Sequence, residues 1–141
     1  MPIRDSEKDR YPADWPEVSR RIRLERAGGK CEWPGCEAPN GELIFRLRRD
    51  PEQWRSPGSG DLDEIDPEYR GVIVVLTVAH LDADGDVCQC RATTGRKCAI
   101  DEHLKAWCQL HHLRYDSKHH VRNAARTRRK NLKNLELFSL A

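Results

Sequence analysis

Aromatic residues make up only 6% of this 141-residue chain, which has one Met and two Phe. Its longest apolar run extends only from Val72 to Leu76, far short of the roughly 20 residues that cross a bilayer. Charged residues reach 34%, and the mean hydropathy is −0.82. No apolar segment follows Arg4 and Asp5 at the start, so we expect no secretory signal. The composition therefore predicts one small domain with a modest core and no membrane contact.

The near-neutral net charge of +2 hides an uneven distribution. Residues 50–68 hold seven acidic residues and one basic residue, whereas residues 114–134 hold eight basic residues and one acidic residue. A basic segment favours a polyanionic partner, although a solvated helix face gives the same pattern.

The six cysteines are the main chemical feature of the chain. Without an export signal we expect a cytoplasmic protein whose thiols stay reduced. Clustered reduced thiols mixed with histidines are typical of metal sites, whereas a secreted chain would pair them as disulfides.

The order of apolar and turn segments predicts an α+β domain spanning residues 1–141. The strongest strand signal is the β-branched run from Val72 to Ala79, which ends at His80. The expected segments are an N-terminal extension (1–13), a helix (14–28), a zinc-binding turn and strand (31–48), an acidic loop insertion (49–71), a core (72–116) and a basic helix with a tail (117–141).

Two short-spaced pairs, Cys31 with Cys36 and Cys108 with His111, predict a structural zinc site. Each pair supplies half of a tetrahedral ligand set, and folding would bring the two halves together. The long interval between them costs little extra loop-closure entropy. The alternative is that these are ordinary buried cysteines beside a surface histidine.

The segments 76–82 and 103–116 resemble the HNH endonuclease family, most of all its small bacterial and phage-encoded members. That family's pattern is a strand ending in His, followed by Asn-Leu-x-x-Leu-Cys-x-x-Cys-His. The resemblance runs from about Trp15 to Asn131, with residues 41–71 an unmatched insertion.

The resemblance implies a small zinc-stabilised ββα-metal core with an N-terminal helix and a basic C-terminal helix. By analogy His80 is the general base that activates water, and His112 binds one divalent cation, such as Mg²⁺, Mn²⁺, Ni²⁺ or Zn²⁺, at the scissile phosphate. The products implied by the family are a 5′-phosphate and a 3′-hydroxyl.

The chain departs from the family pattern at several positions. His103 stands where the family has Asn, the residue that holds the base-bearing loop. Ala79 precedes His80 where a metal-binding Asp is common, so Asp82 or Asp84 is the candidate replacement. Asp116 is a further candidate for that carboxylate. His111 replaces a Cys as the fourth zinc ligand, a change that zinc accepts.

Three further cysteines, Cys88, Cys90 and Cys98, are followed by His103. Together they could form a second Cys3His zinc site, which competes with the positioning role for His103. Alternatively, the three thiols only pack a loop.

The basic C-terminal segment is the candidate surface for DNA backbone contacts, which position a duplex without reading its sequence. Its spacing of four residues predicts a helix with a basic stripe. The candidates are Lys118, Arg122, Arg126, Arg128, Arg129 and Lys130. Three arginines of the first helix could extend this surface: Arg20, Arg21 and Arg23.

The leading hypothesis is therefore a metal-dependent DNA endonuclease that contains one or two structural zinc ions. A non-catalytic zinc-stabilised module that binds nucleic acid is the alternative. A third hypothesis, a protein-interaction adaptor, predicts no salt-dependent DNA affinity. The sequence does not indicate the oligomeric state.

Overall fold

The computed structural model describes residues 3–58, 66–82 and 86–139. Its two antiparallel sheets and its helices make an α+β fold, which confirms the predicted class. In chain order the elements are η1 (Asp5–Arg10), α1 (Trp15–Arg20), η2 (Arg21–Arg26), β1 (Leu43–Leu47), β2 (Trp54–Arg55), β3 (Tyr69–Ile73), β4 (Leu76–His80), α2 (Cys90–Thr94), η4 (Asp101–His103), β5 (Leu104–Cys108) and α3 (Gln109–Ser139).

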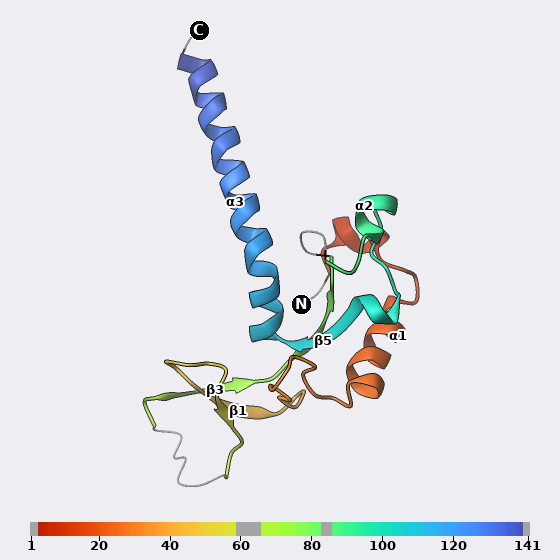
Figure 1. Cartoon of the computed structure of the whole chain (residues 1–141), viewed down its shortest axis with the longest axis vertical. Coiled ribbons are helices and arrows are strands. Elements are labelled where there is room, and N and C mark those ends of the chain that lie inside the picture. The colour runs from red at the N-terminus through yellow and green to blue at the C-terminus, as the bar shows by residue number, and fades with distance from the viewer. Residues whose placement is uncertain (1–2, 59–65, 83–85, 140–141) are drawn as a thin grey trace.

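The central element of the fold is the antiparallel pair β4 and β5. Leu76 pairs with Cys108 at one end of this pair, and His80 pairs with Leu104 at the other. Helix α3 begins at Gln109, immediately after β5. The chain therefore runs as strand, strand and helix through the region that holds the candidate histidines. Figure 1 shows the three-stranded sheet and α2 at opposite ends of this pair.

The N-terminal helical segment covers the β4–β5 pair with one apolar face. Trp15, Val18 and Ile22 are three and four positions apart, so they share a face of the helix, and all three are buried. They pack against β4 and β5, where Ala79 and Leu104 are fully buried. This contact forms the main hydrophobic core.

The prediction of a single strand over residues 72–79 is wrong, because the segment divides between two sheets. β3 ends at Ile73 and pairs with β1, whereas β4 begins at Leu76 and pairs with β5. Two side-chain amides hold the junction: Asn40 Oδ1 accepts from the N–H of Leu76, and Gln109 Oε1 accepts from the N–H of Val75. The apolar run carries no sign of this break, since the side chains that hold it lie far away in the sequence.

The prediction that residues 49–71 form only an acidic loop is also wrong. β2 and β3 flank β1 on its two sides and complete a sheet of order β2-β1-β3. Antiparallel pairing joins Phe45 to both Arg55 and Gly71. The middle of this segment, residues 59–65, lies outside the described part of the chain.

The basic region expected at residues 117–141 continues the helix that starts at the end of β5. α3 is one helix from Gln109 to Ser139, and it runs away from the rest of the molecule (Figure 1). Leu113 and Val121 on this helix are exposed. Within the described residues, no helix is both long and apolar enough to span a membrane.

We expect Ile22→Ala to lower the free energy of unfolding by about 2–5 kcal/mol, because the side chain is fully buried and its loss leaves a cavity. Leu24→Ala is the matched control, since Leu24 lies in the same helical segment but is 44% exposed, and its cost should stay near 0.5 kcal/mol. Urea denaturation of the zinc-loaded proteins measures both. Equal costs would contradict the assigned core.

Candidate functional site

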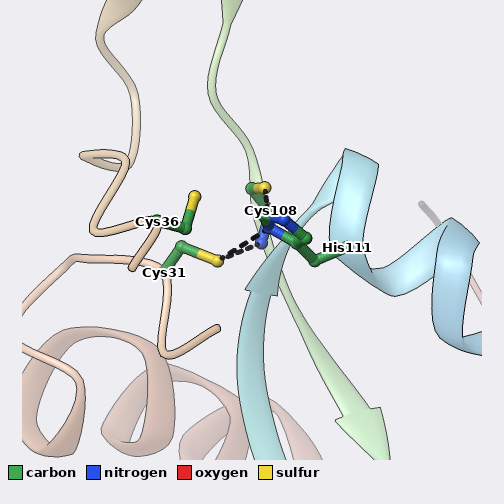
Figure 2. A group of neighbouring side chains, drawn as sticks. All are labelled: Cys31, Cys36, Cys108 and His111. Carbon is green, nitrogen blue, oxygen red and sulfur yellow. Dashed lines mark hydrogen bonds between the residues drawn. The ribbon is translucent and has the colours of Figure 1, made fainter. Parts of the chain in front are cut away.

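The two predicted chelating pairs meet in one buried group, called cluster 1: Cys31, Cys36, Cys108 and His111. Their ligand atoms all lie within 4.8 Å of one another. The first two residues come from the turn after η2, Cys108 ends β5, and His111 lies in the first turn of α3 (Figure 2). All six cysteines of the chain are free thiols.

The spacing within cluster 1 fits a tetrahedral zinc ion. Nδ1 of His111 lies 3.2 Å from Sγ of Cys108 and 3.6 Å from Sγ of Cys31. In a tetrahedron, bonds of about 2.3 Å to sulfur and about 2.0 Å to nitrogen place a sulfur and a nitrogen about 3.5 Å apart and two sulfurs about 3.8 Å apart. Because His111 is fully buried, the alternative of a surface histidine is wrong. Cluster 1 could therefore hold a structural zinc ion.

A buried arginine contacts cluster 1. Hydrogen bonds from the Cys31 and Cys36 thiols lower the pKa of Cys108 below its usual range. Arg46 is only 7% exposed, and its Nη2 donates to Sγ of Cys108 at 3.3 Å. Three thiolates around Zn²⁺ would leave one net negative charge, which this guanidinium compensates.

The ring of His111 is held with Nδ1 facing the thiols. Its Nε2 is 2.7 Å from Oε2 of Glu52, and its ring stacks on Trp33 with the centroids 4.7 Å apart. A carboxylate only accepts hydrogen bonds, so Nε2 carries the proton and Nδ1 keeps a lone pair for a metal. Burial lowers the pKa of His111, which favours the same neutral ring. Glu52 also pairs with Arg114.

Sequence reasoning missed Arg46 and Glu52, which both lie in the insertion at residues 41–71. An isolated Arg or Glu in a chain this rich in charge carries no signal of its own. The one available sign was the position of Arg46 between apolar residues of β1, where a buried charge needs a partner.

A second group, called cluster 2, joins Cys88, Cys90, Cys98 and His103. Sγ of Cys88 lies 3.3 Å from Sγ of Cys98, and Nδ1 of His103 lies 3.6 Å from Cys98 and 3.9 Å from Cys90. The donor set matches that of cluster 1, so cluster 2 could hold a second structural zinc ion. The structure therefore places the ring of His103 against thiols, as the second-zinc hypothesis requires.

His80 lies at the end of β4 in a largely buried aromatic setting, 8% exposed. Its ring stacks on Trp15 at a centroid distance of 5.0 Å, and Tyr11 contacts it edge-on. Nε2–H donates to the carbonyl of Cys98 at 3.2 Å. Burial, together with the positive charge of Lys97, lowers the pKa of His80 to about 4. The ring is therefore neutral near pH 7, with its lone pair on Nδ1.

His112 lies in the first turn of α3, and its ring is half-buried. Its Nδ1 is 2.5 Å from Oγ1 of Thr77 on β4, and its Nε2 is 3.3 Å from Oδ2 of Asp116. The ring of His112 therefore lies between β4, the strand that ends at His80, and the carboxylate of Asp116.

The candidate carboxylates lie at different places around these histidines. Asp82 forms an ion pair with Lys97 at 3.6 Å, and its charge acts to raise the pKa of His80. Asp116 contacts His112. Burial raises the pKa of Asp116, but the hydrogen bond and the charge of His112 outweigh burial, so the pKa of Asp116 is lowered. Asp84 lies outside the described residues.

Within the described chain, clusters 1 and 2 are the groups that bring three or more ligand atoms within 4.8 Å.

The candidate DNA-contacting residues all lie on α3 and are exposed: Lys118, Arg122, Arg126, Arg128, Arg129 and Lys130. The arginines of the first helix are less suited to that role. Arg20 pairs with Glu25 at 3.2 Å, and Arg21 pairs with Asp101 at 2.6 Å. The basic surface is therefore concentrated on the projecting helix.

Two Cys3His clusters and two nearby histidines are thus the chemical features of the described chain. Comparisons with family models, curated proteins and solved structures found no match. The chemistry of these residues is what points to a function.

We expect the purified chain to contain two zinc ions. Cys108→Ser should remove the ion at cluster 1, and Cys98→Ser the ion at cluster 2, because each removes one of four ligands. Elemental analysis by mass spectrometry after gel filtration measures the zinc content of each variant. A wild-type chain with one ion or none would contradict the assignment of both clusters.

We expect Glu52→Gln to weaken zinc binding at cluster 1 by about 10–100-fold, because the amide no longer fixes the His111 ring as the carboxylate does. Competition with a chromophoric chelator measures the affinity. Glu68→Gln, at an exposed residue of the same segment, is the control and should leave the affinity unchanged. Equal affinities for Glu52→Gln and the wild type would show that this carboxylate has no role in zinc binding.

Proposed function

We propose that the chain is a metal-dependent endonuclease of the HNH type, which hydrolyses DNA phosphodiester bonds by nicking or by double-strand cleavage. The observation that carries the proposal is the position of two histidine rings, those of His80 and His112. His80 ends β4, and His112, in the first turn of α3, contacts Thr77 of the same strand through Nδ1. The order β4, β5 and α3 supports a ββα-metal core.

In this proposal His80 is the general base. A neutral imidazole is needed to take a proton from water, and its low pKa keeps His80 neutral at physiological pH. Its Nε2–H is occupied by the carbonyl of Cys98, so Nδ1 is the nitrogen that takes the proton.

His112 would hold the catalytic cation, with the carboxylate of Asp82 or Asp116. When bound, a divalent ion such as Mg²⁺, Mn²⁺, Ni²⁺ or Zn²⁺ supplies charge neutralisation at the phosphate and the leaving oxygen. Because Nδ1 of His112 contacts Thr77, Nε2 is the nitrogen that lies beside Asp116. A site with few protein ligands suits this chemistry, since phosphate oxygens and water complete it.

DNA is the proposed partner, and the exposed basic residues of α3 are the proposed contacts to its backbone. Six free thiols suit a reducing compartment, which supports a cytoplasmic location.

The alternative is a non-catalytic zinc-stabilised module that binds nucleic acid. One observation favours it: the position before His80 is a fully buried alanine, so no carboxylate stands there to bind a cation. In this case α3 still contacts nucleic acid, and His80 and His112 only stabilise the fold.

We expect His80→Ala to reduce plasmid nicking by at least about 100-fold, because the general base is lost. The zinc content and the salt-dependent DNA affinity of the variant should stay unchanged. A plasmid-relaxation assay with added Mg²⁺, Mn²⁺ or Ni²⁺, with and without EDTA, measures activity.

His119→Ala is the matched control and should cut at the wild-type rate. Wild-type activity in His80→Ala would refute the assignment of the base. A wild-type chain that binds DNA but cuts it with none of these cations would favour the alternative.

A further inference from the structure

Three of the four ligands of cluster 2 also contact the dipeptide His80–Leu81 through their backbone atoms. The side chain of His80 donates from Nε2 to the carbonyl of Cys98 at 3.2 Å. The N–H of Leu81 donates to the carbonyl of His103 at 2.9 Å, and the carbonyl of Leu81 accepts from the N–H of Cys88 at 2.7 Å. Cluster 2 and the end of β4 are therefore joined directly.

The segment that carries cluster 2 has little regular structure of its own. Between Cys88 and His103 it contains only the five-residue helix α2 and the three-residue η4. Ile100 within it and Val87 just before it are exposed. A segment with so few buried apolar contacts is held in place mainly by its polar interactions. Chelation by four side chains would be the strongest of these interactions.

We propose that metal binding at cluster 2 positions His80 for the reaction, so that cluster 2 is more than a structural support. This inference rests on the proposed role of His80 as the base. Cys88, Cys98 and His103 are positioning residues: their side chains bind the metal while their backbone atoms set the place of the His80–Leu81 dipeptide. A carbonyl only accepts hydrogen bonds, so the one from Cys98 selects the Nε2–H form of His80.

Cys90 offers a test, because its sulfur contacts His103, whereas the hydrogen bonds described above to His80 and Leu81 come from the other three residues of cluster 2. Cys90→Ala should remove one zinc ion per chain and leave the three hydrogen bonds without their anchor. We expect kcat for plasmid nicking to fall about 10–100-fold while KM for the plasmid stays within about twofold, since a displaced base slows the chemical step and α3 still binds DNA.

Long-range ¹H–¹⁵N NMR correlations provide a readout that does not need activity. In the zinc-loaded wild type we expect the side chain of His80 to show a single protonated Nε2. In Cys90→Ala we expect that signal to broaden or to become a mixture of the two tautomers. Cys90→His, which keeps a zinc ligand, should restore both the second zinc ion and the wild-type signal. Gln89→Ala, the control in the same segment, should change none of these quantities.

The outcomes separate this inference from the proposed function. Loss of the second zinc ion with an unchanged His80 signal and an unchanged kcat would overturn the inference. A changed His80 signal in a chain whose wild type never cuts DNA would support the positioning and refute the nuclease. If Cys90→Ala also loses the first zinc ion, Cys90→Asp titrated with Zn²⁺ decides: the His80 signal must recover as the second site fills, and failure to recover overturns the inference.

Discussion

Convergence of four ligand atoms at cluster 1 is the constraint on which the rest of the structure depends. It joins residues 80 positions apart, Cys31 and His111, and so fixes the N-terminal turn against the start of α3. Closing a loop of this length costs about 4 kcal/mol beyond a constant. Zinc binding contributes about 10–16 kcal/mol in small zinc-finger peptides at neutral pH, so a zinc ion at cluster 1 would offset this cost. A polar chain with a modest core needs such a tie.

The ligands of cluster 1 are supported by two side chains from the insertion at residues 41–71. Arg46 on β1 donates to the sulfur of Cys108, and Glu52 between β1 and β2 holds the ring of His111. Both partners are charged, and both are placed by the sheet of β1, β2 and β3. The three-stranded sheet would therefore be part of a metal centre at cluster 1, because a zinc ion bound by three thiolates would otherwise lack its counter-ion.

The spacing of Cys and His residues along the sequence predicts candidate metal ligands well, because two ligands of one ion often lie only a few residues apart. The prediction that the chain brings together Cys31, Cys36, Cys108 and His111 is confirmed, and so is the grouping of the three remaining cysteines with His103. Polar contacts between residues far apart in the sequence produce no such local sequence pattern. Asn40 and Gln109 hold the chain at the break after Ile73, and β2, which completes the sheet in the insertion, has only two residues. The assignment of His80 and His112 to catalysis stays a prediction.

The two candidate catalytic histidines are each tied to a different cluster. His112 directly follows His111, so cluster 1 sets the first turn of α3 and with it the place of His112. His80 is held by the carbonyl of Cys98, so its orientation depends on cluster 2. The distance between a base and a cation site would then depend on two separate chelated groups joined by the β4–β5 pair, which is short and well buried. Such an arrangement would give a small polar domain the rigidity that the proposed phosphodiester hydrolysis requires, because a misplacement of about 1 Å can cost about 100-fold in rate.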